Sequence, residues 1–457
     1  MAKKEKTVFV CQQCGYESAQ WIGKCICGAW NSFVEEKVLP NIQEDPRRRA
    51  TTAKAKPSAL KTVGTAHYER IDTGIGELNR VLGGGLVKGS LVLISGEPGI
   101  GKSTIIIQTA ANLAAQGKIV LYVSGEESEE QIKLRADRVC PNLSDNLLVL
   151  AETNMENVET ICGELKADFL IVDSIQTMYS SQADSAPGSV SQVRVCGNQL
   201  MKLGKTRNMP IFIVAHVTKS GELAGPKTVE HLVDCVLNFS GERDQEIRVL
   251  RSFKNRFGTT SEIGAFRMEA AGLMELPDIS ATFLEGQDEQ VEGSVTTAVY
   301  EGTRPVMFEI QALVSPANIG FARRTSVGID NNRLNMILAV MEKKAGLQLV
   351  NQDVYVNVVG GIKPDGTSTD LAAALAIYSS LKRVTPARKT LAVGEIGLTG
   401  EIRNVQNAEK IAKEAARMGY KLVIMPKNNA EKLPKELGGA RVVGVRNIIE
   451  AIKALSI

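Results

Sequence analysis

A glycine-rich stretch after a short apolar run constrains the fold of this chain more than any other feature. The run Leu91–Ser95 is followed by Gly96, Glu97, Pro98, Gly99, Ile100, Gly101, Lys102, Ser103 and Thr104. This fits G-x-x-x-x-G-K-[ST], the phosphate-binding P-loop, whose glycines let the backbone curl around a phosphate. The N–H groups of such a loop and the N-terminus of the next helix face the anion. We therefore expect a strand, a loop and a helix in this order, with these nine residues binding ATP.

Further short apolar runs follow the P-loop and alternate with helical patterns. The runs expected to be buried strands are Ile119–Ser124, Phe169–Val172 and Ile211–Ala215. Such a β-α-β-α rhythm is typical of a parallel sheet that helices cover on both faces. Residues 66–275 are therefore predicted to form an α/β ATPase domain with a parallel sheet.

Acidic side chains follow two of the expected strands. Asp173 closes the run Phe169–Val172, and ligands of open α/β sheets bind at the carboxyl ends of the strands. We predict that Asp173 and the Ser103 hydroxyl hold Mg²⁺ and that Lys102 reaches the β- and γ-phosphates. Hydrolysis also needs a base that orients the attacking water, and Glu126 is favoured over its neighbour Glu127. The alternative is that both glutamates are solvated or cap the next helix.

Two more polar residues are candidate sensors of the γ-phosphate. Gln176 lies just beyond Asp173 and is predicted to take part in catalysis by passing the presence of the phosphate to a moving loop. His216 follows the run Ile211–Ala215 and is a candidate for a related role. The alternatives are a surface amide for Gln176 and a buried, hydrogen-bonded imidazole for His216.

The cysteines divide into a cluster near the N-terminus and four scattered residues. Cys11, Cys14, Cys25 and Cys27 are predicted to bind Zn²⁺ as two knuckles. The alternative is a metal-free finger held by Trp21, Trp30 and Phe33. The scattered thiols are Cys140, Cys162, Cys196 and Cys235. They do not make a disulfide framework in a chain this long, so we expect inert core thiols and a cytoplasmic protein.

Composition divides the rest of the chain. Residues 8–35 hold the cysteine finger, residues 36–65 are polar and basic and are expected to be a flexible linker, and residues 276–292 are polar and acidic. Residues 285–457 are predicted to form an α+β domain. Its expected strands are 294–299, 308–314 and 354–359, and its expected helices are 332–344, 369–381 and 408–418.

Bulk properties exclude some functions and leave others open. The net charge of +3 is too small to indicate nucleic-acid binding, so any DNA surface must be local. No apolar run approaches the roughly 18 residues that a membrane span needs, and we expect no membrane partner.

The motif Lys254-Asn255-Arg256-Phe257-Gly258 is the strongest candidate for such a local surface. Two cations beside an aromatic ring suit phosphate contacts and base stacking. They also suit an arginine or lysine finger that completes the nucleotide site of a neighbouring subunit, so Lys254 and Arg256 are catalytic candidates as well. The alternative is an ordinary basic turn. Residues 178–192 and 217–230 are expected to be mobile loops, the second with Lys219 and Lys227 as further DNA contacts.

Together these motifs resemble the RecA superfamily and, within it, the bacterial RadA (Sms) family of recombination proteins. The resemblance is carried by Asp72–Ile75, Leu82–Leu86, the P-loop, Tyr122–Ser128, His216–Lys219, Gly225–Lys227 and Lys254–Gly258. It covers the cysteine finger, a RecA-like ATPase core and a C-terminal domain similar to that of Lon proteases. The chain departs from the family at Cys25-Ile26-Cys27, where the family normally has C-x-x-C.

The resemblance implies a homo-hexameric ring with ATP between its subunits and single-stranded DNA through its centre. The implied activity is that of a DNA-dependent ATPase and helicase, which promotes branch migration of recombination intermediates in homologous recombination and repair. RecA recombinase is the implied partner, and a replicative helicase is a second candidate.

The Lon-like domain is expected to lack protease activity. Ser368 falls where Lon places its nucleophile, but Glu409 takes the place of the activating lysine and Lys410 is one residue out of register. We expect a scaffold for hexamers with a further DNA surface, for which the candidates are Arg323, Arg324, Lys343 and Lys344. Two other functions stay open: an ATP-dependent protease, and an ATP-gated signalling or autokinase module, because Gly83-Gly84-Gly85 also resembles the lead-in of clock-type kinases.

Overall fold

A computed structural model describes most of the chain. The described residues are 6–11, 16–38, 69–215, 228–241, 246–284, 291–317, 322–360, 364, 366–386 and 389–455. Cys14, His216, Lys219, Lys227 and linker residues 39–65 lie outside them. The chain divides into two compact units, Met1–Glu275 and Leu276–Ile457. None of the helices in the described ranges is long and apolar enough to cross a membrane.

The N-terminal segment forms a small antiparallel ribbon. Its strands are β1 (Lys6–Cys11), β2 (Glu17–Ser18) and β3 (Phe33–Val38), in the spatial order β2-β1-β3. Cys11, Cys25 and Phe33 make its small core. Among the described residues this core is small, and a bound metal ion is one means by which so small a fold is stabilised.

The ATPase unit is built on a nine-stranded sheet. Its strands are β6 (Leu91–Gly96), β7 (Val120–Ser124), β8 (Leu147–Ala151), β9 (Phe169–Asp173), β10 (Ile211–Val214), β11 (Cys235–Ser240), β12 (Ile247–Asn255), β13 (Ile263–Glu269) and β14 (Gly272–Glu275). Their spatial order is β14-β13-β12-β11-β6-β10-β9-β7-β8. The six strands from β11 to β8 are parallel, and β12, β13 and β14 extend the sheet in antiparallel fashion.

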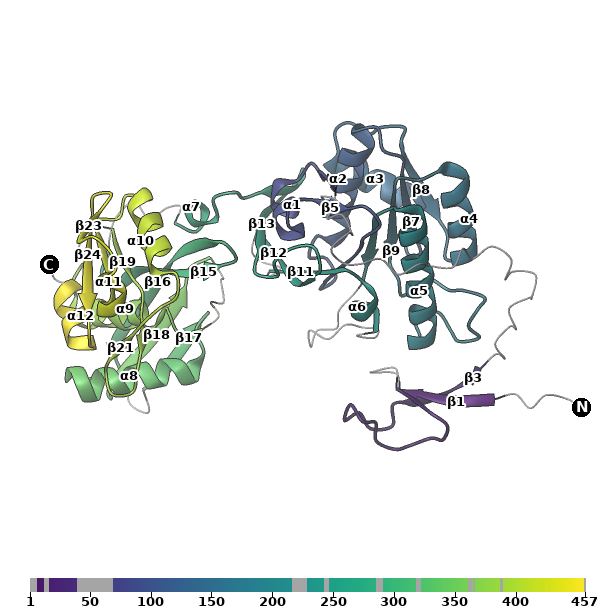
Figure 1. Cartoon of the computed structure of the whole chain (residues 1–457). Coiled ribbons are helices and arrows are strands. Elements are labelled where there is room, and N and C mark those ends of the chain that lie inside the picture. Colours follow the sequence, from purple (N-terminus) through teal and green to yellow (C-terminus); the bar gives the residue numbers. More distant parts are fainter. Residues whose placement is uncertain are drawn as a thin grey trace, which may run out of the picture. The chain divides into compact units, whose positions relative to one another are not determined.

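Helices cover both faces of this sheet (Figure 1). They are α1 (Gly76–Leu82), α2 (Lys102–Ala115), α3 (Glu129–Val139), α4 (Met155–Leu165), α5 (Val190–Arg207) and α6 (Thr228–Leu232). One core cluster joins α1, α2 and α3 to the sheet, and a second joins α4, α5 and α6 to its other face. Successive residues of β6 alternate between the two clusters, which explains why this strand is apolar throughout.

Local sequence signals fix where these helices begin. Ser128 accepts a hydrogen bond from the Gln131 N–H, and the Gln131 side chain bonds back to the Ser128 N–H, which makes a capping box for α3. The side chains of Asn154 and Ser189 cap α4 and α5, each by accepting one hydrogen bond from a backbone N–H of the first turn. A two-stranded ribbon of β4 (Arg70–Ile71) and β5 (Leu86–Val87) flanks α1.

The C-terminal unit contains a mixed eight-stranded sheet in the order β17-β18-β16-β15-β19-β22-β24-β23. These strands are β15 (Ser294–Glu301), β16 (Arg304–Pro316), β17 (Arg324–Val327), β18 (Gln352–Val358), β19 (Thr390–Ala392), β22 (Leu422–Pro426), β23 (Glu436–Leu437) and β24 (Ala440–Val445). A short pair, β20 (Glu395–Ile396) and β21 (Ile402–Arg403), lies apart from it.

Helices complete this unit. They are α7 (Ile279–Phe283), α8 (Asn331–Ala345), α9 (Asp370–Lys382), α10 (Ala408–Arg417), α11 (Lys427–Ala430) and α12 (Ile448–Leu455). The buried helix α9 packs against β15 and β16. Arg333 on α8 forms a bidentate ion pair with the buried Asp370 at the start of α9, which joins the two helices.

Candidate ATP and DNA sites

The P-loop connects the centre of the sheet to α2. Strand β6 ends at Gly96 and α2 begins at Lys102. Gly96 has φ +148°, and a Cβ placed on it would lie 2.7 Å from the carbonyl oxygen of Phe239. The neighbouring strand therefore leaves no room for a side chain at this position. Glycine also adopts the positive φ with which the chain leaves the strand and enters the loop.

Lys102 points back into the loop that precedes it. Its Nζ donates hydrogen bonds to the carbonyl oxygens of Gly96 at 2.8 Å and Glu97 at 3.0 Å. Burial lowers the pKa of the Lys102 ammonium, and the carboxylates of Asp173 and Glu126 oppose that shift. The cation is thus held against the backbone of the loop.

Asp173 and Ser103 face each other at the carboxyl edge of the sheet. The Ser103 hydroxyl donates to Oδ2 of Asp173 at 3.0 Å, and the Tyr122 hydroxyl donates to the same oxygen at 2.6 Å. A hydroxyl and a carboxylate this close are hard oxygen donors of the kind that Mg²⁺ prefers beside nucleotide phosphates, so these residues fit that ion.

The two adjacent glutamates have separate partners. Glu126 is exposed, and its Oε1 accepts a hydrogen bond of 2.5 Å from the Ser174 hydroxyl. Glu127 forms a bidentate ion pair with Arg135 of α3, with 2.6 Å between Nη1 and Oε2. This hydrogen-bonded pair raises the pKa of Arg135. Glu127 is therefore fixed, and Glu126 is left facing the loop after β9.

These groups surround one cavity of about 450 Å³. Its described lining is Pro98, Gly99, Gly101, Lys102, Ser103, Thr104, Ser124, Glu126, Glu127, Arg135, Arg138, Asp173 and Met268. The lining contains six of the nine residues that we predicted for ATP, together with the residues predicted for Mg²⁺ and the base, whereas Gly96, Glu97 and Ile100 are not part of it. Gln176 is not part of this described lining. Arg135 and Arg138 belong to it and were not predicted from the sequence.

The motif Lys254–Gly258 lies near the amino ends of the parallel strands, whereas the P-loop follows the carboxyl end of β6. Buried Asp234 precedes β11 and accepts hydrogen bonds from Arg256 Nη1 at 3.0 Å, Lys205 Nζ at 3.0 Å and the Leu91 N–H at 3.1 Å. Leu91 is the first residue of β6, whose last residue opens the P-loop. The motif is thus attached to the amino end of the strand that carries the P-loop.

The other residues of the motif are held by their neighbours. Lys254 Nζ donates to the carbonyl oxygens of Glu230 at 2.6 Å and His231 at 3.4 Å, near the end of α6. The Asn255 amide donates to the Val81 carbonyl at 3.2 Å, and its oxygen accepts from the Phe257 N–H. Arg256 is more open, with 55% of its side chain exposed.

The motif also contacts the glycine run that precedes β5. Arg70 donates hydrogen bonds to the carbonyl oxygens of Phe257, Leu82 and Gly85. Gly83 has φ +83°, and a Cβ on it would lie 3.1 Å from the Cα of Gly258. Two motifs that are far apart in the sequence therefore pack together, and the close approach needs glycine.

The loop after β9 is better anchored than its sequence indicated. The buried Gln192 amide donates to the carbonyl oxygens of Ser180, Ala183 and Ser185, and its oxygen accepts from the Ser180 N–H. Glu156 accepts from the Ser180 hydroxyl as well. Residues 190–192 belong to α5. The loop predicted at 178–192 therefore ends at Ser189, and its mobility stays a prediction.

Three of the four predicted zinc ligands lie together in the ribbon. The Sγ atoms of Cys11, Cys25 and Cys27 are within 4.8 Å of one another, and Cys11 and Cys27 are 3.9 Å apart. Four thiolates around Zn²⁺ would have sulfur atoms about 3.8 Å apart, so these residues fit the ion. Of the three residues of the alternative metal-free finger, Phe33 is buried in the small core, whereas Trp21 is 51% and Trp30 is 70% exposed.

In the C-terminal unit, Glu409 and Lys410 have partners other than Ser368. Glu409 forms an ion pair with Lys413 on the surface of α10, and Lys410 donates to the Tyr300 hydroxyl at 2.6 Å. Of the proposed DNA contacts, Arg324 donates to the Asn335 side chain at 3.5 Å, and Lys343 and Lys344 lie in the last turn of α8.

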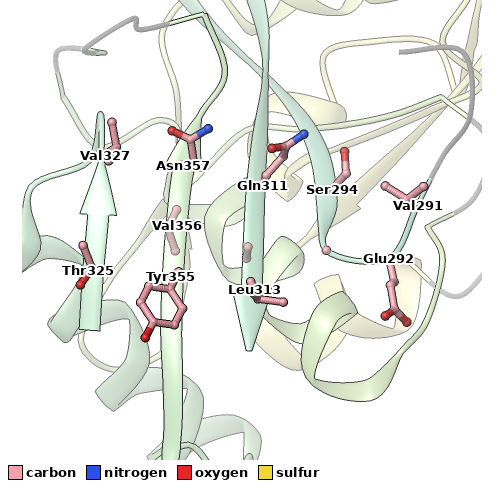
Figure 2. Close-up of a pocket in the computed structure, with 12 residues that line it drawn as sticks. Val291, Glu292, Ser294, Gln311, Leu313, Thr325, Val327, Tyr355, Val356 and Asn357 are labelled. Atoms are coloured by element: carbon pink, nitrogen blue, oxygen red, sulfur yellow. The ribbon is translucent and has the colours of Figure 1, made fainter. Parts of the chain in front are cut away.

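A hollow of about 400 Å³ lies on one face of the C-terminal sheet (Figure 2). Side chains of β16, β17 and β18 line it, among them the exposed Leu313 and Val327. Its described lining contains one charged residue, Glu292, and neither lysine nor arginine. This hollow is therefore unsuited to phosphate, and a DNA surface on this unit must be sought elsewhere.

Comparison with known proteins places the whole chain. It is 49% identical over 453 residues to the DNA repair protein RadA of Bacillus subtilis (strain 168), covering 98% of each chain. It is 49% identical over 458 residues to the DNA repair protein RadA of Listeria monocytogenes serovar 1/2a, covering 99% of each. The chain belongs to the RadA family. The predicted resemblance is thus confirmed.

Family models agree with the parts of this RadA family chain. Residues 9–35 match the model described as rubredoxin metal binding domain, residues 54–222 match an AAA domain, and residues 317–429 match the ChlI subunit of Mg-chelatase. The crystal structure of the RadB recombinase aligns with 45% of this chain and 99% of that chain, at 21% identity and a TM-score of 0.36.

These findings confirm the predicted fold class: a RecA-like α/β ATPase with an N-terminal metal-binding ribbon and a Lon-like C-terminal domain. The ATPase family implies nucleotide and Mg²⁺ as ligands. The sequence analysis assigned no site role to Tyr122, Arg135, Arg138 or Asp234. Tyr122 lies in the motif Tyr122–Ser128, but its contact with Asp173 joins two strands and cannot be seen in the sequence. The contacts of Arg135 with Glu127 and of Asp234 with Arg256 likewise form only when the chain folds.

Proposed function

We propose that this chain is a DNA-dependent ATPase and helicase that moves along single-stranded DNA and promotes branch migration of recombination intermediates. Its relatives from Bacillus subtilis and Listeria monocytogenes are DNA repair proteins, which supports a role in recombination and repair. The P-loop cavity, with its cation, carboxylates and hydroxyl, supports ATP hydrolysis as the source of motion.

The observation that carries this proposal is that the P-loop and the motif Lys254–Gly258 lie at opposite ends of strand β6. Strand β6 has six residues, which span about 17 Å, and it runs from the contact with Asp234 to the P-loop. Arg256 thus lies too far from the nucleotide of its own chain to touch it. It is open to a second copy or to DNA. We infer a homo-hexamer in which Arg256 completes the ATP site of its neighbour.

Arg256 is the better finger of the two motif cations. The Lys254 ammonium already donates to two backbone carbonyls of α6, and burial together with nearby Arg256 lowers its pKa. Arg256 is half-exposed, and its guanidinium pairs with Asp234. A planar guanidinium also binds phosphate in bidentate fashion, which an ammonium does not. Lys254 is assigned to holding α6 beside the motif.

Within the cavity, each residue has a distinct task in the proposed hydrolysis. Lys102 would bind the β- and γ-phosphates, and Ser103 and Asp173 would hold Mg²⁺, which neutralises charge on the phosphate oxygens. Glu126 would orient the attacking water, because Arg135 holds the neighbouring Glu127. We propose that Gln176 responds to the γ-phosphate from the loop beyond Asp173.

DNA contacts are proposed at Lys254, Asn255, Arg256, Phe257 and Gly258, and at Lys219 and Lys227, which lie outside the described residues. RecA recombinase and a replicative helicase are proposed partners on the family resemblance alone. The C-terminal unit is proposed as a scaffold without protease activity, since the lysine nearest the expected place donates to Tyr300.

The test is ATP turnover by the full-length protein with and without single-stranded DNA, repeated on three-way and four-way DNA junctions. We expect strong stimulation by single strands and movement of the junctions. Arg256→Ala should lower stimulated turnover by at least about 100-fold. Lys205→Ala is the matched control, because it removes the other cation bound to Asp234. A rate that ignores every added polynucleotide would contradict the proposal.

A further inference from the structure

A buried phenol lies against the carboxylate that is expected to hold magnesium. Tyr122 is 1% exposed, and its hydroxyl donates to Oδ2 of Asp173 at 2.6 Å. It comes from β7, where Tyr122 pairs in register with Ile171 of β9. Ile171 and Asp173 point to the same face of β9, so the phenol approaches the carboxylate from within the core. Tyr122 does not line the described cavity.

The same carboxylate oxygen serves two donors. Oδ2 of Asp173 accepts from the Ser103 hydroxyl at 3.0 Å on the cavity side and from the phenol on the core side. Hydrogen bonds to a charged acceptor are short and strong, and they hold a carboxylate in one orientation. Partners of this kind, which bind a ligand group rather than the ion, commonly change metal affinity 10- to 100-fold when removed.

We propose that Tyr122 is a positioning residue for Mg²⁺: its hydroxyl fixes the orientation of Asp173 in which this carboxylate and Ser103 bind the ion together. The inference rests on the proposed ATP site and extends it to a residue that touches neither nucleotide nor DNA. Without the Tyr122 hydroxyl, the Asp173 carboxylate can adopt several orientations. Only one of them places it beside Ser103 for binding the ion.

A purely structural role makes different predictions. A buried phenol needs an acceptor, and Asp173 could simply be the nearest one. In that case, removal of the hydroxyl changes the stability of the fold and leaves metal binding alone. Metal affinity, measured apart from turnover, therefore separates the two roles.

The experiment compares wild type with Tyr122→Phe as full-length proteins. Mn²⁺ is the probe, and its binding is followed by electron paramagnetic resonance with a non-hydrolysable ATP analogue present. We expect Mn²⁺ affinity to fall by about 10-fold or more in Tyr122→Phe. Affinity for a fluorescent ATP analogue in excess chelator should not change, because the P-loop is intact. Turnover should recover at high Mg²⁺.

Two further variants serve as controls. Tyr420→Phe removes another buried phenol, which donates to the Thr296 hydroxyl at 3.0 Å in the C-terminal unit, and it should bind Mn²⁺ like wild type. Ile171→Val loosens the same core cluster without touching the carboxylate. At matched loss of thermal stability, Ile171→Val should keep wild-type Mn²⁺ affinity.

Each outcome decides one claim. Wild-type protein that binds no Mn²⁺ with the analogue would overturn the ATP site itself. Wild type that binds, with Tyr122→Phe binding equally well, would overturn the positioning role alone. The same holds if Ile171→Val weakens Mn²⁺ binding as much as Tyr122→Phe does. Weaker binding confined to Tyr122→Phe supports the inference.

Discussion

Glu126 and Glu127 are adjacent in the chain, yet their carboxylates have different surroundings. Glu127 is held by Arg135 through two hydrogen bonds, whereas Glu126 accepts a hydrogen bond from the Ser174 hydroxyl. An ion pair of this geometry restricts a side chain to one orientation. At the scale of the residue, a contact on α3 therefore separates a fixed glutamate from one that is able to reach water in the cavity.

This difference gives a prediction for paired variants. Glu126→Gln should lower ATP turnover by about 10²- to 10⁴-fold, the range for loss of a general base, and should leave ATP binding intact. Glu127→Gln should lower turnover much less, because it weakens the pair with Arg135 and keeps the base. Single-turnover hydrolysis and equilibrium nucleotide binding measure the two effects. A more severe loss in Glu127→Gln than in Glu126→Gln would reverse the assignment.

At this scale the sequence predicts residues whose position is set by a local pattern. Ser103 and Asp173 follow from the P-loop and from the end of an apolar strand. Arg135 and Asp234 do not, because their roles depend on partners that folding brings near from other elements. Asp234 in particular belongs to no recognised motif. Its role as the acceptor that joins Leu91 to Arg256 can be seen only in the folded structure.

The elements of the ATPase sheet and its helices enclose four thiols. Burial raises the pKa of Cys140 and Cys162 to about 11 and that of Cys196 and Cys235 to about 12. Since the thiolate is the reactive form, a raised pKa keeps these groups protonated and inert at neutral and mildly basic pH. Cys27 of the ribbon is exposed by contrast.

Alkylation should therefore separate the two kinds of cysteine. At pH 8, iodoacetamide should leave the four buried thiols unmodified in native protein and modify them after denaturation. The ribbon thiols should react slowly with metal bound and quickly after chelation, because only the free thiolate attacks. Peptide mass spectrometry identifies each site. Ribbon thiols that react equally with and without chelator would contradict the zinc proposal.

Elements differ in how well the sequence predicts them. The parallel strands are apolar because helices cover both faces of the sheet, so their apolar runs could be predicted as strands. The run Ile119–Ser124, for example, forms the strand Val120–Ser124. Strand β12 was missed because its buried and half-buried residues alternate and it carries charged side chains. The hydrogen bonds of the loop after β9 were not predicted because they come from the Gln192 amide, which lies in the first turn of α5.

At the scale of the whole molecule, strand β6 connects the proposed arginine finger, Arg256, with the P-loop. Asp234 holds both Arg256 and the amino end of β6, and the carboxyl end of β6 opens the P-loop. Under the proposed function, β6 would connect a contact made by Arg256 to the P-loop. In a ring, this arrangement would place the finger of one subunit at the ATP of the next, through a head-to-tail interface.

Mixing two inactive variants tests this central claim most directly. Lys102→Ala lacks the grip on phosphate but keeps Arg256, and Arg256→Ala keeps the P-loop but lacks the finger. Each alone should show little DNA-stimulated ATP hydrolysis. A 1:1 mixture should regain up to about a quarter of wild-type turnover, because some interfaces then combine an intact P-loop with an intact finger. A mixture as inactive as its components, or full activity of Arg256→Ala alone, would contradict the account.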